Sequence, residues 1–221
     1  MTSEAAIRIL RAADRPAAAW KNGGGVTREI AAGPEGAGMD DFAWRASLAE
    51  VTAGGPFSVF PGVDRILTLA EGAGMDLDIA GVRRLVDRRH APQRFPGDQP
   101  TDCRLLGGPV VNFNVMYRRD AVSAGTAVVR GELALAVRPG ETLLVVALEG
   151  SAGLAGVDGV YGSAGGAGSA GGGGGGAFDG SAELGPYDAA LVTGPRELTL
   201  RSPGCAAVVR LVPVPGRGQP A

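Results

Sequence analysis

Apolar residues along this chain recur in short runs, either alternating with polar residues or standing together for a few positions. The runs are rich in Val, Ile and Leu and are bounded by Gly, Pro or Asp, a pattern typical of β-strands joined by tight turns. A helical spacing is present only near residues 5–13, where it is weak. The pattern predicts an all-β sandwich or barrel with strands at 26–32, 43–51, 64–72, 75–81, 111–118, 126–131, 133–137, 142–150, 188–194, 197–202 and 206–214.

Both halves of the chain repeat an arrangement of strand, Gly-containing turn and strand. In the first half this arrangement is GPFSVFPGVDRILTLAEGAGMDL, and in the second half it is RPGETLLVVALEGSAGL. Strands that end in Glu-Gly and turn into the next strand are similar to those of cupin barrels. We therefore expect a bicupin, with two cupin-like β-barrels of the jelly-roll type at 1–119 and 120–221.

Residues 162–176, GSAGGAGSAGGGGGG, form a low-complexity segment within the second half. Its side chains are too small to offset the entropy lost on ordering, so we expect a flexible surface loop. The segment contains a formal match to the dinucleotide fingerprint, Gly-x-Gly-x-x-Gly. No strand pattern leads into it and no helical pattern follows, so the match is rejected.

Composition excludes several classes of partner. The net charge of -2 gives no electrostatic reason to bind nucleic acid or an anionic membrane. No run approaches the roughly 18 apolar residues that a membrane helix needs. Charged residues interrupt the first 20 positions, which therefore lack the apolar core of a secretory signal, and a cytoplasmic location is expected. In that compartment Cys103 and Cys205 are expected to be two buried thiols, the alternative being a disulfide.

The sequence also argues against a metal site. His90 is the only histidine, and we expect it to be a surface loop residue. A cupin holds its metal with His-x-His, a following glutamate and a later histidine. Alignment on the LAEG turn places that glutamate at Arg65 and the histidines within 58–61, where no histidine occurs. A guanidinium repels the cation that a carboxylate would bind, so no metal and no other cofactor is expected.

The stretch WKNGGG, residues 20–25, combines residue types suited to a small ligand. Lys21 is the only lysine in the chain, and it stands beside Asn22 and three consecutive glycines. Lysine supplies a compact charge with rotatable donors, asparagine both donates and accepts, and glycine N–H groups can form a concavity that holds an anion. The alternative is a tight turn with a solvated lysine. A small carboxylate or amide suits this stretch better than a nucleotide.

Strand alternation adds further candidates. Thr27 and Glu29 share one face of their predicted strand and are placed toward the cavity, the alternative for Glu29 being a surface residue. Arg65 is expected to point into the barrel, the alternative being a surface ion pair with Asp64 or Glu71. Asn112 and Asn114 share a face with Met116, and Ser58 alternates with Phe60. The candidate ligand-binding residues are Lys21, Asn22, Gly23, Gly24, Thr27, Glu29, Ser58, Phe60, Arg65 and Asn114; no catalytic residue is assigned.

Four motifs together resemble the HutD/Ves family. They are WKNGGGVTREI, WRASLAEV, GPFSVFPGVDR, and FPGD followed by LLGGPVVNFNVMYRR, and they cover residues 20–119 in the expected order. The second half resembles only a generic cupin-like barrel. The resemblance implies a bicupin associated with histidine utilisation, without a settled enzymatic activity, that senses a pathway intermediate. Asn112 stands where the family pattern has aspartate.

Three functions remain open from the sequence. The preferred one is a metal-free regulator that binds a small anionic metabolite similar to urocanate, formiminoglutamate or N-formylglutamate, and a homodimer is compatible with it. The second is a metal-independent cupin isomerase or hydrolase that uses Glu29 or Lys21 as acid or base. The third is a scaffold for a protein partner. We favour binding because no complete set of nucleophile, base and oxyanion donors can be assembled.

Overall fold

The computed structural model describes residues 6–156, 160–161 and 181–215. These residues form β-strands joined by turns, and their one helical element is the 3-10 turn η1, Ala12–Asp14. The all-β prediction is therefore confirmed. No helix in the described ranges has the length and apolar character that a membrane span requires. The predicted Gly-rich loop at 162–176 lies outside the described residues.

The chain divides into two compact units, each of which combines a long central segment with one end of the chain. The N-terminal unit comprises Arg15–Val128 and Val209–Ala221, and the C-terminal unit comprises Met1–Asp14 and Val129–Val208. This division differs from the expected one at 119/120. Each terminal segment belongs to the unit that is formed mainly by the opposite half of the chain.

The C-terminal unit is built on an eight-stranded sheet in the order β15-β1-β17-β13-β18-β14-β16, with β12 paired to β18. Apolar side chains fill its interior, and those of Ile7, Leu143, Val145 and Leu200 are fully buried. The longest strands, β12 and β18, each join two of the predicted runs and continue along the chain into the N-terminal unit. The strands are β1 (Ala6–Leu10), β12 (Val122–Val137), β13 (Thr142–Glu149), β14 (Ala152–Ala155), β15 (Val160–Tyr161), β16 (Ser181–Leu184), β17 (Ala189–Thr193) and β18 (Arg196–Pro213).

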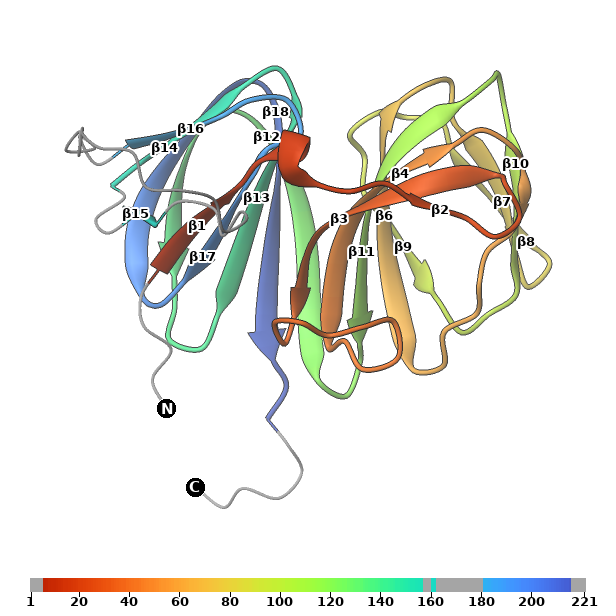
Figure 1. Ribbon diagram of the computed structural model, residues 1–221, viewed down its shortest axis with the longest axis horizontal. Helices are drawn as coiled ribbons and strands as arrows, with labels where there is room; N and C mark the ends of the chain where they lie inside the picture. Colours follow the sequence, from red (N-terminus) through yellow and green to blue (C-terminus); the bar gives the residue numbers. More distant parts are fainter. Residues whose placement is uncertain (1–5, 157–159, 162–180, 216–221) are drawn as a thin grey trace, which may run out of the picture. The chain divides into compact units, whose positions relative to one another are not determined.

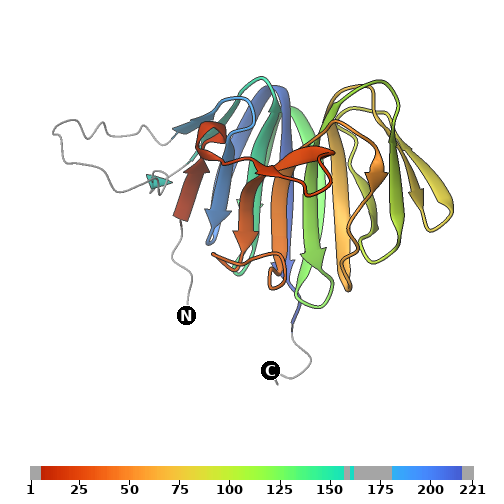
Figure 2. The same cartoon turned by 45° about the vertical axis from the view of Figure 1, so that its right-hand side comes forward.

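Strand β1 corrects the weak helical prediction near residues 5–13. Ile7 and Ile9 are buried while their neighbours are partly exposed, which is the two-residue alternation of a strand. β1 pairs antiparallel with β17, with Ile7 opposite Val192. Figures 1 and 2 show β1, in dark red, beside blue strands from the end of the chain. Burial against a distant strand overrides the local preference of the sequence.

The N-terminal unit contains two sheets. The larger has the order β2-β3-β4-β11-β6-β9 and the smaller has the order β5-β10-β7-β8 (Figure 1). The larger sheet consists of β2 (Ala18–Ala19), β3 (Gly25–Gly33), β4 (Trp44–Val51), β11 (Val110–Arg118), β6 (Val63–Glu71) and β9 (Gln93–Pro96). The smaller consists of β5 (Gly55–Pro56), β10 (Thr101–Leu105), β7 (Met75–Ile79) and β8 (Val82–Val86).

Apolar side chains from both sheets of the N-terminal unit form one core. Leu69 of β6, Leu77 of β7 and Phe95 of β9 are among its buried members. Cys103 lies in the same core, and burial raises the pKa of its thiol to about 11. Cys103 and Cys205 are both buried and are not joined in a disulfide, which confirms the two-thiol prediction.

Candidate functional site

A cavity of about 610 Å³ lies in the N-terminal unit against one face of the larger sheet. It is lined by strands β3, β4, β11 and β6, by the segment Ala18–Asn22, by residues between Pro56 and Phe60, and by Met39 from the loop between β3 and β4. Among the described residues, the lining contains three cationic side chains and no carboxylate, histidine or cysteine. The lining residues are Ala18, Ala19, Trp20, Lys21, Asn22, Thr27, Met39, Arg45, Ser47, Ala49, Pro56, Phe57, Ser58, Phe60, Arg65, Leu67, Asn112, Asn114 and Met116.

Two adjacent cross-strand rows of the sheet hold four of the polar lining residues, Ser47, Asn114, Arg45 and Arg65. In one row Ser47 of β4 lies opposite Asn114 of β11. In the next row Arg45 of β4 lies opposite Met116 of β11, which lies opposite Arg65 of β6. Side chains directly opposite one another on neighbouring strands point to the same face. Both rows therefore point into the cavity, and Asn114 and Met116 share a face as alternation predicted.

Residues 20–25 form the tight turn that leads into β3. The Gly23 N–H donates to the Trp20 carbonyl oxygen at 3.0 Å, and the Gly24 N–H donates to Asn22 Oδ1 at 3.0 Å. Gly23 has a φ of 71°, and a Cβ on Gly25 would lie 2.3 Å from a backbone oxygen of β4. The N–H groups of Gly23 and Gly24 are thus used within the turn. The glycines serve the geometry of the turn rather than an anion.

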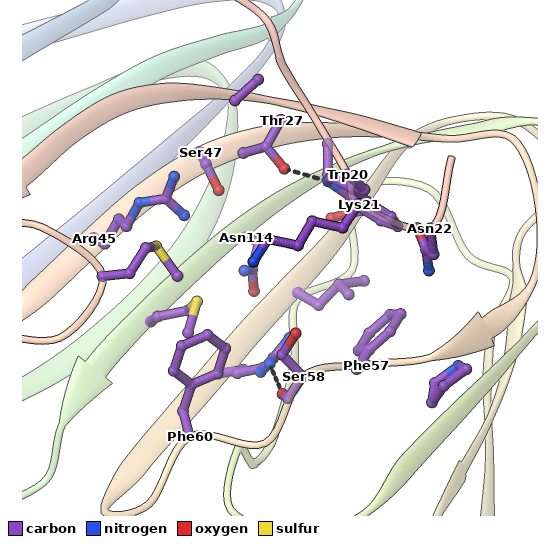
Figure 3. Close-up of a pocket in the computed structure, with 18 of the residues that line it drawn as sticks. Trp20, Lys21, Asn22, Thr27, Arg45, Ser47, Phe57, Ser58, Phe60 and Asn114 are labelled. Carbon is purple, nitrogen blue, oxygen red and sulfur yellow. Dashed lines mark hydrogen bonds between the residues drawn. The ribbon is translucent and has the colours of Figure 1, made fainter. Parts of the chain in front are cut away.

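The same turn places Lys21 and Asn22 at the rim of the cavity. Both are exposed residues of the lining. Trp20 fixes the turn, because its Nε1 donates a hydrogen bond to Thr27 Oγ1 at 2.8 Å. Figure 3 shows this bond, with the Lys21 side chain reaching across the cavity toward Asn114. The turn therefore presents the lone lysine to the cavity.

Arg65 is a buried cation in the wall of the cavity. The residue is 7% exposed, and its guanidinium carbon lies 5.4 Å from the ring centroid of Phe57 and 5.2 Å from that of Phe60. Its Nη2 donates to the Ser58 carbonyl oxygen, and its buried Nε has no hydrogen-bond partner in the described chain. No described carboxylate pairs with it. Burial away from water lowers the pKa of Arg65 from 12.5 to about 10.

The FPGD motif at 95–98 supports this environment. A Cβ on Gly97 would lie 3.3 Å from Arg65 Nε, so glycine leaves room for the arginine stem. Asp98 and Asp64 both pair with Arg119. Asp64 is therefore not the surface partner of Arg65 that the alternative interpretation required.

Neutral polar side chains of the lining are buried as well. Ser47 and Asn112 are 2% and 3% exposed, and Asn114 Oδ1 is fully buried with no hydrogen-bond partner among the described residues. A buried polar atom without a partner costs free energy. A molecule that supplies partners in the cavity therefore gains affinity from each of them.

Glu29 does not line the cavity itself but is paired with Arg45, a lining residue. Its Oε2 accepts a hydrogen bond from Arg45 Nε at 2.6 Å, and the two side chains are 46% and 13% exposed respectively. Thr27 lies opposite Ala49 and Glu29 lies opposite Ser47, so Thr27 and Glu29 share a face as predicted. Thr27 lines the cavity. Glu29 does not line it but pairs with Arg45, which does.

Most of the candidates from the sequence meet at this cavity. The members of the lining are Lys21, Asn22, Thr27, Ser58, Phe60, Arg65 and Asn114. The candidates outside the lining are Gly23, Gly24 and Glu29. The lining residues that the sequence did not single out include Arg45, Ser47 and Phe57, while Trp20 and Asn112 were noted in motifs but not chosen as ligand-binding candidates. The alternation Arg-x-Ser-x-Ala in residues 45–49 was a usable signal for Arg45 and Ser47.

Comparison with known proteins gives the family. The HutD family model matches residues 12–209. The chain belongs to the HutD family. The match includes the second half of the HutD chain, for which the motifs alone indicated only a generic cupin-like barrel.

Two curated relatives match about half of this HutD chain. One is a 21.2 kDa protein in the hutC 3′ region of Pseudomonas putida, 40% identical over 111 residues, which are 50% of this chain and 58% of that protein. The other is Protein Ves of Cronobacter sakazakii, 41% identical over 110 residues, which are 49% of this chain and 59% of that protein. The matched stretch spans less than two thirds of either relative.

Solved structures support the same family and a cupin-like fold. HutD from Pseudomonas fluorescens, in a structure described as a formate condition, is 28% identical with a TM-score of 0.76, covering 95% of this chain and 100% of that one. A cupin 2 conserved barrel domain protein from Leptotrichia buccalis is 8% identical with a TM-score of 0.51, covering 86% of this chain and 89% of that one. The latter likeness concerns the fold alone.

A metal of the kind that many cupins hold does not fit the HutD cavity. Its described lining offers no carboxylate, imidazole or thiol, which are the usual protein ligands. It offers instead the cations Lys21, Arg45 and Arg65. The electrostatic character of the cavity is that of an anion site.

Proposed function

We propose that this HutD protein is a bicupin whose N-terminal barrel binds a small anionic metabolite, and that it acts as a metal-free sensor or regulator linked to histidine utilisation. The observation that carries the proposal is Arg65, a buried guanidinium in the cavity wall with no carboxylate partner among the described residues. A buried charge without a partner costs folding free energy unless something else compensates it. A bound carboxylate is a natural partner.

The rest of the lining supports a carboxylate that also carries polar groups. Lys21 adds a second positive charge at the rim, and the amides of Asn112 and Asn114 can each donate and accept. Phe57 and Phe60 supply apolar walls around the guanidinium. Urocanate, formiminoglutamate and N-formylglutamate all combine a carboxylate with further polar atoms. The relative from the hutC 3′ region supports the choice of histidine-derived compounds.

The lining supports binding more than catalysis. The enzymatic alternative uses Glu29 or Lys21 as acid or base, and Glu29 lies outside the cavity lining and is paired with Arg45. Lys21 is then the one described lining residue that suits proton transfer. A single amine without a paired acid or base is a poor set for isomerisation or hydrolysis.

The test is a thermal-shift screen with urocanate, formiminoglutamate, N-formylglutamate, histidine and glutamate, followed by calorimetry on any compound that raises the melting temperature. A compound at 100 times its Kd stabilises the folded protein by roughly 2.7 kcal/mol. Arg65→Met should then weaken binding about 10- to 150-fold, because a hydrogen bond to a charged group contributes about 1.5–3 kcal/mol. Product analysis of the same mixtures checks for turnover.

The matched control is Arg88→Met. Arg88 is an exposed arginine of the same unit that does not line the cavity. Arg88→Met should leave the affinity unchanged, because it changes the net charge by the same amount as Arg65→Met but does so outside the cavity. Equal losses in both variants would show a non-specific charge effect and refute the site. Conversion of any compound to a new product would favour the enzyme.

A further inference from the structure

Two arginines of the cavity lie in one cross-strand row but differ in their partners. Arg45 Nε donates to Glu29 Oε2 at 2.6 Å, whereas no described carboxylate pairs with Arg65. The terminal nitrogens of Arg45, Nη1 and Nη2, make no hydrogen bond with a described residue. In Figure 3 the Arg45 guanidinium points toward Ser47, inside the cavity. One edge of the guanidinium is thus held, and the other edge is open.

We infer that Arg45 is a second anion-binding group of the cavity and that Glu29 is its positioning residue. The inference rests on the proposed function, the binding of a carboxylate in this cavity. By holding Nε, Glu29 leaves the Nη1/Nη2 fork of Arg45 free, and this fork matches the two oxygens of a carboxylate. Glu29 stands outside the lining, so it acts on a bound anion only through Arg45.

Glu29 has two effects on an anion in the cavity, and they have opposite signs. Its own negative charge repels the anion, so a carboxylate with no other role would weaken binding, and its removal would strengthen it. Its hold on Arg45 immobilises a flexible side chain before the anion arrives. That immobilisation is worth about 2- to 13-fold in affinity, since ordering one such side chain on binding costs about that much. The direction of the change on removing Glu29 therefore decides between the two roles.

The chain supplies a matched control on the same pair of strands. Glu50 of β4 pairs with Arg28 of β3, and neither residue lines the cavity. The Glu50 and Glu29 side chains are 48% and 46% exposed respectively. Glu50→Ala thus removes a carboxylate of similar exposure from a cross-strand arginine that does not face the cavity.

The experiment is a titration of the full chain with sodium formate, the smallest carboxylate, at an ionic strength held constant with sodium chloride. The arginine side-chain nitrogen–hydrogen signals are followed by NMR, with Arg45→Ala identifying the Arg45 signals. Glu29→Ala should weaken formate binding about 2- to 13-fold. Glu29→Gln should lose less affinity for formate, because the amide oxygen of the glutamine can still accept a hydrogen bond from Arg45 Nε. Glu50→Ala should bind formate as tightly as the parent protein or slightly more tightly.

Two further measurements separate positioning from a general effect on the fold. In the Arg45→Ala background, Glu29→Ala should cause no additional loss of affinity, because the residue on which it acts is absent. The free energy of unfolding of Glu29→Ala and Glu29→Gln should stay close to that of Glu50→Ala. Two outcomes would overturn the positioning role of Glu29 but not the carboxylate site. One is that Glu29→Ala binds formate as tightly as the parent protein or more tightly. The other is that Glu29→Ala loses as much affinity in the Arg45→Ala background as in the parent protein. Parent-protein signals that do not respond to formate overturn the carboxylate site itself and this role with it.

Discussion

The indole nitrogen of Trp20 donates a hydrogen bond to the hydroxyl of Thr27 at 2.8 Å, across the turn that leads into β3. This bond closes the glycine turn from the side that faces the cavity. Lys21 follows Trp20 directly, so the position of the lone lysine depends on a hydroxyl in the neighbouring strand. Residues 20–25 therefore contribute to the cavity by positioning Lys21 through a turn, and not by forming a nest of N–H groups that binds an anion.

Thr27→Val should therefore affect both the stability of the protein and its site. The substitution keeps the shape of the side chain but removes the acceptor of the Trp20 hydrogen bond, so we expect a loss of about 1 kcal/mol in the free energy of unfolding. Affinity for a carboxylate should fall as well, because Lys21 loses its support. Urea denaturation and calorimetry measure the two effects. Thr27→Ser, which retains the hydroxyl, should behave like the parent protein, and an equal loss there would contradict the explanation.

Gly25→Ala should be the most damaging single change in the turn. Its Cβ would lie 2.3 Å from the Glu50 carbonyl oxygen, so β3 and β4 would have to separate. We expect destabilisation of about 2–3 kcal/mol from this overlap. Gly23→Ala meets nothing within 4 Å but must hold a φ of 71°, which costs about 1–2 kcal/mol. A urea denaturation series in which Gly23→Ala is the more damaging variant would argue against close strand approach as the main constraint.

The sequence predicted the cavity wall where two-residue alternation was unbroken. Asn114 and Arg65 lie where alternation and the cupin alignment placed them. Alternation also placed Glu29 on the correct face, but it does not show how far from the cavity a residue lies along that face. The register shift between Glu29 and Ala31 and the pairing with Arg45 are properties of two strands together. A single strand pattern does not contain them.

Arg65→Met should stabilise the unliganded protein. Burial lowers the pKa of Arg65 from 12.5 to about 10, so the unfolded chain holds its proton more firmly than the folded one. The corresponding cost to folding, about 3 kcal/mol, is present in full below pH 10 and is relieved as the pH rises toward 12.5. The gain from Arg65→Met should therefore be about 1–3 kcal/mol at pH 8 and should shrink above pH 10. Denaturant unfolding of both proteins at several pH values measures it; a loss of stability at pH 8 would assign Arg65 a structural role.

Asp188 should make the stability of the C-terminal unit depend on acid pH. Burial alone raises the pKa of Asp188, but hydrogen bonds from the Ala12 N–H, Arg11 and the Gly185 N–H outweigh it, and the net pKa is lowered from 3.8. The stabilisation is thus present above pH 3.8 and is lost as the pH falls through the lower folded-state pKa. Asp188→Asn should cost about 1–3 kcal/mol at pH 7.

The pH profile of that difference is the check. Denaturant unfolding of Asp188→Asn and the parent protein should converge as the pH falls below 3.8. Asp14→Asn, an exposed carboxylate in the same η1 turn, should change little at any pH. A difference between Asp188→Asn and the parent that persists unchanged to low pH would show that geometry, not charge, is responsible.

Two of the strands that the sequence missed, β8 and β1, show what a local pattern lacks. β8 carries two arginines and is exposed at four of its five positions, so it lacks the apolar alternation that marks a half-buried strand. β1 does alternate, but its partner β17 lies at the far end of the chain. Pairing and exposure of this kind are decided by the assembled sheets, and the local sequence carries little of that information.

The pairing of β1 with β17 also sets an order of events during synthesis. The ribosome releases residues 6–10 well before their partner strand, Ala189–Thr193. At about 5–20 residues per second the interval is about 10–40 seconds. The segment Arg15–Val128, which makes up most of the N-terminal unit, is complete well before then. The apolar residues of β1 therefore remain without their β17 partner while the segment Arg15–Val128 folds. Their exposure during this interval makes them a binding site for a chaperone.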